Sequence, residues 1–160
     1  MRDQRSQNIA PYMEAVGLVS AVWAHLELNF DMIIANLTGG DAEAVGCITM
    51  QFGSYYPKLS AIIALCKYRG VSKPIIEELK TMRGQLADPA ERRNRLIHDA
   101  WLIKGGHVTG KASHKVRPAR DQTLTECESL RRAINKFALK TIRLRQEIKR
   151  ELATSSQTCP

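Results

Sequence analysis

The stretch VGLVSAVWAHLELNFDMIIANL, residues 16–37, decides the class of the fold. An α-helix completes a turn every 3.6 residues, so apolar residues in alternating steps of three and four form one stripe along a long helix. Pro11 suits a first-turn position and predicts a start near residue 10, and Gly39-Gly40 predicts the end. The stripe consists of Val16, Val19, Trp23, Leu26, Phe30, Ile33 and Leu37.

Two further stripes of the same kind follow along the chain. Apolar residues at helical spacing span residues 45–66, where Gly53 and Pro57 predict a kink. The next stripe spans residues 75–86 and follows Ser72, whose hydroxyl can cap the first turn. These stripes predict a second, kinked helix and a third helix.

The rest of the chain is predicted to hold a short helix, an excursion and a long last helix. The sequence DPAE, residues 88–91, is typical of a fresh helix start with Asp88 as the cap. Gly105-Gly106, between short apolar runs, favours a small hairpin. The last stripe begins near Thr125 and continues to Ile148.

Together these elements predict an all-α fold. We expect an up-and-down helical bundle of four to five helices, with a short irregular or hairpin excursion before the last helix. Aromatic residues make up only 6% of the chain, which favours helices over strands. A chain of 160 residues is the size of one domain. We therefore expect a single domain over residues 1–160, with flexible ends of about residues 1–8 and 153–160.

The composition also restricts the compartment and the partners. A net charge of +8 favours attraction to polyanions such as RNA. The N-terminus lacks the apolar run of a signal peptide and no stretch of 18 apolar residues is evident, so we expect a cytoplasmic protein without a membrane partner. No metal site is expected from the Cys and His spacing, and the cysteines are predicted to be reduced thiols: Cys47, Cys66, Cys127 and Cys159.

The sequence ERRNRLIHDAW, residues 91–101, places polar and basic residues on an otherwise amphipathic helix. On a continuous helix Asn94, His98 and Trp101 share a face, because they stand four and three residues apart. Arg93 continues the apolar seam of the preceding helix, where an unpaired charge is costly. It is offset from His98 by about 140° and ~7.5 Å along the axis, so its long side chain could still reach a ligand held at the imidazole.

These groups suit phosphoryl transfer from RNA without a metal or other cofactor. A neutral imidazole can take the proton of a 2′-hydroxyl, a guanidinium matches two phosphate oxygens, and a carboxamide can orient phosphate or ribose. One histidine serves poorly as both base and acid, so a second copy of the chain would be useful. A structural interpretation is also open, in which Arg93 pairs with Glu91 or another acid and His98 favours the helix dipole.

Basic side chains elsewhere could track the RNA backbone. One side of the last helix carries Arg132, Lys136, Lys140, Arg143 and Arg150. Such a face is most often only solvated, and that alternative stays open. The residues predicted to contact RNA are Arg92, Arg95, Lys136, Lys140 and Arg143.

The sequence RNRLIH, residues 93–98, resembles the Rx4–6H motif of the HEPN superfamily, in the form where Asn follows the Arg. Trp101 stands three residues after the His, as in several bacterial branches of that superfamily. In architecture the resemblance covers the whole chain, with a long first helix centred on AVWAHLE and a second containing YYPKLSAII.

The resemblance implies an all-α homodimer in which two motifs face each other across a cleft. It implies a metal-independent endoribonuclease with Arg93 and His98 as the catalytic pair and Asn94 shaping the site. Members in toxin–antitoxin systems add an antitoxin protein as an expected partner. Because other members lack nuclease activity, the alternative is an inactive module that binds RNA, a nucleotide or a partner protein.

Overall fold

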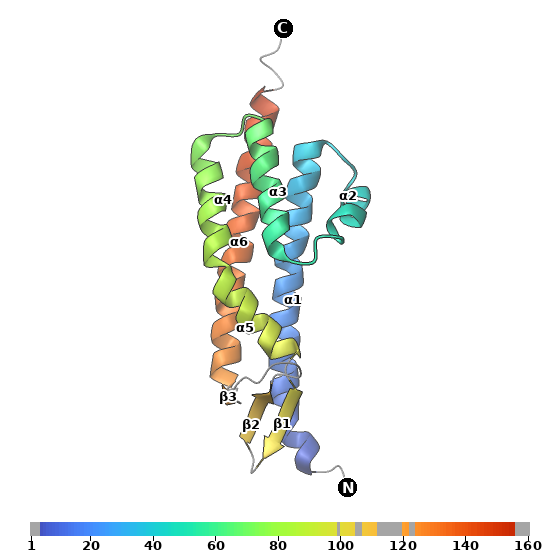
Figure 1. Cartoon of the computed structure of the whole chain (residues 1–160), viewed down its shortest axis with the longest axis vertical. Coiled ribbons are helices and arrows are strands. Elements are labelled where there is room, and N and C mark those ends of the chain that lie inside the picture. Colours follow the sequence, from blue (N-terminus) through green and yellow to red (C-terminus); the bar gives the residue numbers. More distant parts are fainter. Residues whose placement is uncertain (1–3, 99, 105–106, 112–119, 122–123, 156–160) are drawn as a thin grey trace. The chain divides into compact units, whose positions relative to one another are not determined.

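The structure, a computed structural model, describes residues 4–98, 100–104, 107–111, 120–121 and 124–155 (Figure 1). The described chain has six helical segments, and Leu86 alone separates α4 from α5 in the sequence. The prediction of a helical fold is confirmed, and the short strands lie in the excursion before the last helix. In chain order the elements are α1 (Gln4–Thr38), α2 (Ala42–Thr49), α3 (Tyr55–Tyr68), α4 (Lys73–Gln85), α5 (Ala87–His98), β1 (Ala100–Lys104), β2 (His107–Lys111), β3 (Arg120–Asp121) and α6 (Leu124–Ser155).

The chain divides into two compact units, and each is described by itself. The motif unit comprises Met1–Trp23 and Ala87–Asn135, and so contains α5, the strands and the first parts of α1 and α6. The bundle unit comprises Ala24–Leu86 and Lys136–Pro160, with α2, α3, α4 and the remaining parts of α1 and α6. A single domain over the whole chain stays a prediction.

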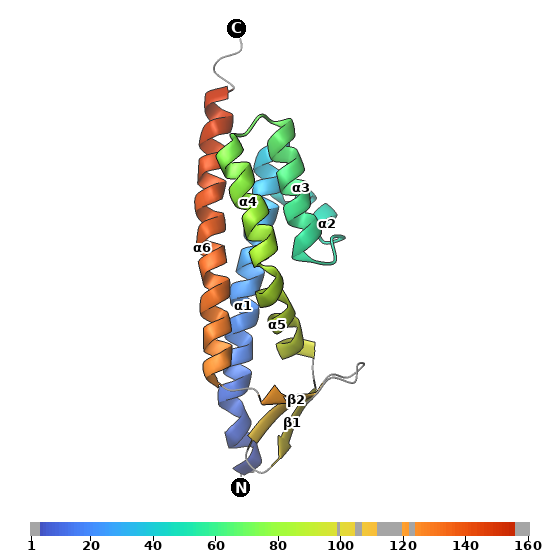
Figure 2. The ribbon, with the colours of Figure 1, turned by 60° about the vertical axis from the view of Figure 1, so that its left-hand side comes forward.

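In the bundle unit, α1, α3, α4 and α6 lie side by side around an apolar core (Figures 1 and 2). The stripes predicted from the sequence form this core, because burying one stripe per helix removes apolar surface from water and leaves polar side chains outside. Residues of this unit with 0–1% exposure include Leu26, Phe30, Ile33, Leu37, Leu59, Ile62, Leu79, Met82, Leu86, Leu144 and Ile148.

Two polar contacts join α3 to α1 within the bundle unit. Lys58 Nζ lies 2.9 Å from Oδ1 of Asp31, and Lys58 is only 7% exposed. Near the end of α3, Arg69 Nη1 donates to the carbonyl oxygen of Leu37 at 2.9 Å, which satisfies an acceptor in the last turn of α1. Because a buried ammonium without a partner is costly, the Lys58–Asp31 pair restricts how α3 can pack on α1.

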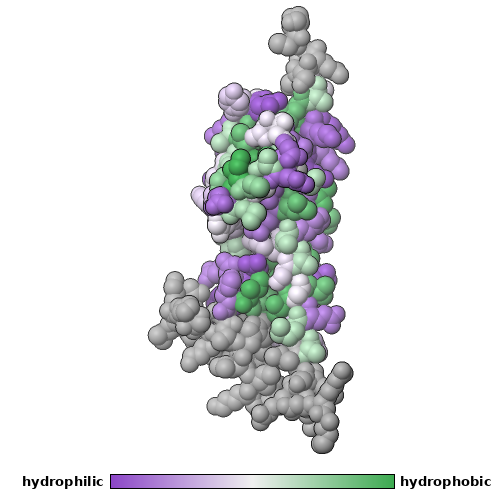
Figure 3. All heavy atoms as spheres, turned by 90° about the vertical axis from the view of Figure 1, so that its right-hand side faces the viewer, coloured by the Kyte–Doolittle hydropathy of each residue, from purple (hydrophilic) through white to green (hydrophobic). Residues whose placement is uncertain are grey.

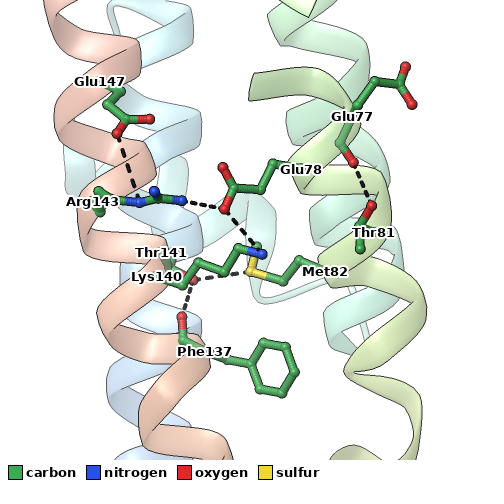
Figure 4. Close-up of polar contacts among 9 residues, drawn as sticks. All are labelled: Glu77, Glu78, Thr81, Met82, Phe137, Lys140, Thr141, Arg143 and Glu147. Carbon is green, nitrogen blue, oxygen red and sulfur yellow. Dashed lines mark hydrogen bonds and ion pairs between the residues drawn. The ribbon is translucent and has the colours of Figure 1, made fainter. Parts of the chain in front are cut away.

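Figure 4 shows the polar contacts between α4 and α6 in the same unit. Glu78 of α4 pairs with Lys140 of α6, whose Nζ lies 3.1 Å from the carboxylate, and with Arg143. Beside them Thr141 Oγ1 lies 3.7 Å from Sδ of Met82. The carboxylate of Glu78 therefore pairs with two of the cations that were predicted to contact RNA.

Of the two predicted helix caps, Ser72 holds the N-cap position of α4 without a cap hydrogen bond from its side chain, and the prediction of Asp88 as a cap is wrong. The side chain of Ser72 makes no cap hydrogen bond; its backbone N–H donates to Oε2 of Glu151 at 2.8 Å. α5 begins at Ala87, before the predicted cap Asp88. Leu86 keeps near-helical dihedral angles (φ −78°, ψ −8°) and its N–H bonds back to α4 at 3.0 Å, so the helical hydrogen bonds continue without a cap.

Both long helices extend further than predicted. α1 begins at Gln4, and Pro11 lies inside it rather than in its first turn. A proline at this position removes one backbone hydrogen bond, and the helix nevertheless continues to Thr38. α6 continues to Ser155, so residues 4–8 and 153–155 are helical where flexible ends were expected.

The kink predicted within residues 45–66 is a full break between α2 and α3. Residues 50–54 are not helical, and α2 has its own N-cap, in which the Asp41 carboxylate accepts two backbone N–H groups. α2 and the turn after it expose Ile48 (63%) and Met50 (79%). Figure 3 shows hydrophobic side chains on the face that carries α2.

The predicted hairpin is confirmed by its backbone pairing, although Gly105-Gly106 lie outside the described residues. β1 and β2 pair antiparallel with Lys104 opposite His107, and β3 pairs with β2. This pairing corrects the placement of Trp101, which lies in β1 and not on a helix with His98. From residue 100 onward the backbone N–H and C=O groups pair between strands, so α5 ends before β1 begins.

Among the described residues one helix is long and apolar enough, by length and composition alone, to cross a membrane, and the absence of a membrane partner stays a prediction. Ala10–Thr38 contains an 18-residue window of mean hydropathy 1.3, of which 44% is buried inside the structure. Core helices meet the same criterion, because a buried stripe such as that of Leu26 and Phe30 raises the hydropathy of the whole segment.

Met82 and Met50 provide a matched test of the bundle core. Met82 is 0% exposed and Met50 is 79% exposed. Met82→Ala should lower the free energy of unfolding by about 2–5 kcal/mol, because it leaves a cavity in the core. Met50→Ala should change it by less than about 0.5 kcal/mol. Urea denaturation followed by circular dichroism measures both, and equal losses would contradict this packing.

The cysteines provide a test of burial by chemical reactivity. Burial raises the pKa of the Cys66 thiol to about 12, with the charge of Glu151 adding to the effect, and Cys47 is exposed. The thiolate is the reactive form, so at pH 8 Cys66 stays a protonated, inert thiol. Iodoacetamide should therefore label Cys47 in the native protein and Cys66 only after unfolding, as peptide mass spectrometry can determine. Equal labelling rates in the native protein would contradict the burial of Cys66.

Candidate functional site

α5 positions the predicted motif on three turns of helix in the motif unit. Its buried side consists of Pro89, Ala90 and Leu96, which anchor the helix. Asn94 and His98, one turn apart, are exposed. The local pattern thus places a carboxamide and an imidazole together on the outer side of α5.

Arg93 is half-buried and contacts two neighbours. Its guanidinium carbon lies 5.6 Å from the ring centroid of Trp23 in α1, and its Nη1 donates to Oδ1 of Asn94 at 3.1 Å. Trp23 is 5% exposed, as its position on the apolar stripe predicted. The ring and the carboxamide together direct the arginine side chain.

No carboxylate neutralises Arg93 among the residues that the structure describes. The ion pair with Glu91 that the structural interpretation required is not formed there, and Nε of Arg93 is buried without a hydrogen-bond partner. The adjacent Arg92 differs, because its Nη1 lies 3.7 Å from Oδ2 of Asp88. A ring attracts a cation through its quadrupole but leaves the net charge in place. Arg93 therefore keeps a full positive charge and an unused donor.

The motif residues are only partly brought together in one chain. Arg93 and Asn94 are hydrogen-bonded, but no described contact joins His98 to either of them. On a regular helix Arg93 and His98 point about 140° apart, and Arg93 turns toward Trp23. A phosphate that contacts both groups would need a longer reach by Arg93 or a second copy of the chain.

Arg92 and Arg95 line a cavity of about 440 Å³ between α5 and α6 of the motif unit. Asp88, Glu91 and Glu126 line the same cavity, so its lining carries charges of both signs. The full lining is Asp88, Glu91, Arg92, Arg95, Leu96, Glu126, Cys127 and Leu130. The predicted contact of these two arginines with RNA stays a prediction, but they do not form a purely basic surface.

The other predicted RNA contacts belong to the bundle unit. Lys140 and Arg143 pair with Glu78, and Arg143 also lies 3.8 Å from Glu147. Lys136 is exposed, and no acid among the described residues pairs with it. Only Lys136 of these three keeps a charge that is free to attract a phosphate.

The contact of Arg93 with Trp23 was not foreseen from the sequence. The sequence contained one indication of this contact. If the apolar stripe of α4 is continued at helical spacing it reaches Arg93, so a charge stands where an apolar contact is expected. Which ring it would meet depends on how α1 packs against α5, and no local pattern specifies that.

Neither a metal site nor a known relative identifies the site further. In the described part of the chain, no three His, Cys, Asp or Glu side chains gather as metal ligands would. The chain matches no family model, no curated protein and no solved structure. The inference about function therefore depends on the geometry and on the motif.

A substitution of Arg93 separates a structural role from a functional one. Arg93→Met keeps apolar contact with Trp23 and removes a buried donor that costs about 1–3 kcal/mol when unpaired. The lost contact with the ring is worth about 0.5–2 kcal/mol, so the variant should unfold in urea with unchanged or slightly higher stability. Arg92→Met removes the same charge from the same helix and is the control. A loss of more than about 1 kcal/mol for Arg93→Met relative to this control would show that Arg93 is structural.

Proposed function

We propose that this protein is a metal-independent endoribonuclease of HEPN type, with Arg93, Asn94 and His98 as its catalytic residues. One observation carries the proposal: among the described residues the guanidinium of Arg93 contacts a ring and a carboxamide and no carboxylate, next to an exposed Asn94 and His98. A guanidinium that no described carboxylate offsets can still attract the phosphate of a substrate.

The proposed reaction is an intramolecular transesterification of RNA. His98 takes the proton of a 2′-hydroxyl, whose oxygen attacks the adjacent phosphorus, and the bond from phosphorus to the 5′-oxygen breaks. Arg93 binds the phosphoryl oxygens as their negative charge grows, and Asn94 orients the phosphate or ribose. The leaving 5′-oxygen takes a proton from the protonated histidine of a second copy, and the products end in a 2′,3′-cyclic phosphate and a 5′-hydroxyl.

The partners follow from the same proposal. A homodimer supplies the second histidine, which the separation of Arg93 and His98 on one helix makes useful. The net charge of +8 favours a polyanionic ligand, which the proposal takes to be RNA, and the cytoplasm is the proposed compartment. An antitoxin protein as a further partner stays part of the proposal. The alternative function is an inactive module that binds RNA, a nucleotide or a protein at the same site.

Cleavage of RNA in EDTA tests the proposal directly. The wild-type protein should cleave a mixed-sequence single-stranded RNA, and His98→Ala should lower the rate by at least about 100-fold, because it removes the general base. His25→Ala is the matched control, since His25 is another exposed histidine on a helix, and its rate should be unchanged. Gel electrophoresis with phosphatase treatment identifies the cyclic phosphate ends.

Two outcomes would contradict the proposal. If wild type and His98→Ala are equally inert on several RNAs but bind them, the protein is a binding module. If cleavage persists at the wild-type rate in His98→Ala, the activity belongs to another group or to a contaminant.

A further inference from the structure

The outer surface of α3 and α4 in the bundle unit carries a tyrosine whose ring is held by an arginine. Tyr56 of α3 is 52% exposed, and the guanidinium carbon of Arg83 in α4 lies 4.8 Å from its ring centroid. The two helices lie side by side in both views of the ribbon (Figures 1 and 2). An aromatic ring is therefore presented to solvent with a cation against it.

Three contacts hold this arrangement in place. Arg83 Nη1 donates to Oγ of Ser60 at 3.0 Å, and Ser60 Oγ donates to the carbonyl oxygen of Tyr56 at 2.9 Å. The ring of Tyr55 meets that of Tyr56 at 81° with 6.3 Å between centroids. A ring that is already ordered loses little conformational entropy when a ligand stacks on it.

The charge of Arg83 is not neutralised by an acid among the described residues. The neighbouring Lys80, in contrast, lies 2.6 Å from Oε1 of Glu77. Arg83 therefore resembles Arg93 of the motif unit: each contacts an aromatic ring and a polar side chain and keeps its full charge.

Cations outnumber acids on this surface. The hydrogen bond from Lys80 lowers the pKa of Glu77, and the charges of Lys80, Lys73 and Lys67 lower it further. α3 itself contains no acidic residue, and Glu78 of α4 pairs with α6 instead. We define the α3–α4 face by Tyr56, Lys67, Lys73, Lys80 and Arg83.

We propose that the α3–α4 face binds single-stranded RNA, with a base stacked on Tyr56 and a neighbouring phosphate bound by Arg83. Single-stranded nucleic acid is bound by aromatic rings that stack on bases and by cations that follow the backbone, and this face combines both. Duplex RNA would not suit it, because paired bases do not expose the faces that stack. The proposal rests on the proposed function only in taking RNA as the ligand.

Binding measured without cleavage tests the stacking contact. In the His98→Ala protein, fluorescence anisotropy with a labelled 12-nucleotide oligouridine measures the affinity. Tyr56→Ala should weaken binding by about 5- to 100-fold, the range found when one stacking ring is removed, and Tyr56→Phe should bind as tightly as its parent. Tyr68→Ala is the matched control, because Tyr68 is 86% exposed on the same helix and no described guanidinium lies on its ring, so its affinity should be unchanged.

A salt titration tests the phosphate contact. Arg83→Gln should weaken binding and reduce the slope of log affinity against log salt by about 0.7, the contribution of one phosphate contact on a single strand. Arg131→Gln is the control, because Arg131 already donates two hydrogen bonds to Glu128, at 2.8 Å and 2.7 Å, and the slope should change little. Circular dichroism melting of each variant checks that the fold is kept.

The α3–α4 face and the nuclease can fail separately. The proposal for the α3–α4 face is overturned by any of three results. Tyr56→Ala has the same affinity as Tyr68→Ala, Tyr56→Phe has an affinity as low as that of Tyr56→Ala, or no oligonucleotide binds. If the wild type cleaves RNA while Tyr56→Ala leaves binding and cleavage unchanged, the nuclease stands and the face does not. If binding depends on Tyr56 but no product ever forms, the face stands and the nuclease does not.

Discussion

The helices of this chain are held by the burial of one apolar stripe on each, and this burial restricts where every polar group can go. Each large buried side chain contributes about 1.5–3 kcal/mol relative to exposure, so the stripes outweigh any single polar contact. The polar residues that fall among them need a partner within reach. Asn29, at 2% exposure, donates to the carbonyl oxygen of His25, and Thr141, at 0%, donates to that of Phe137. Such local bonds let polar side chains lie in the core.

Two sets of cationic side chains among the described residues differ in what they contact. Lys140 and Arg143 pair with Glu78, and Arg92 pairs with Asp88, so their charges are compensated within the protein. Arg83 and Arg93 contact aromatic rings and no described carboxylate. A ring stabilises a cation without cancelling its field, so these two arginines can still attract an anion. The distinction separates cations that hold helices together from cations that can bind a ligand.

The surroundings of the two ring-bound arginines suit different tasks. Arg93 is half-buried and lies next to the exposed carboxamide of Asn94, which can orient a phosphate. The imidazole of His98, five residues later on the same helix, can move a proton. Arg83 lies against the exposed ring of Tyr56, with Lys80 about one helical turn earlier in α4, and no histidine or carboxylate among the described residues contacts Arg83. The first arrangement fits chemistry on a phosphodiester, and the second fits retention of a strand. A nuclease that acts on single-stranded RNA would use both.

The sequence by itself determined the helices, the hairpin and the place of the motif on a short helix. Those features depend on residues within a few positions of one another, such as the stripe from Val19 to Leu37 or the pairing beside Gly105-Gly106. The predicted stripe also placed Trp23 in the core.

Only the tertiary structure decided which charge meets which partner. Glu78 stands 65 residues before Arg143, and Glu151 stands 79 residues after Ser72, so neither the ion pair nor the replaced cap could be read from local spacing. The same holds for the rings that receive Arg83 and Arg93. The physical reason is that a periodic pattern specifies which side of a helix is buried, whereas the contacts of a long charged side chain depend on which helix packs beside it and at what height.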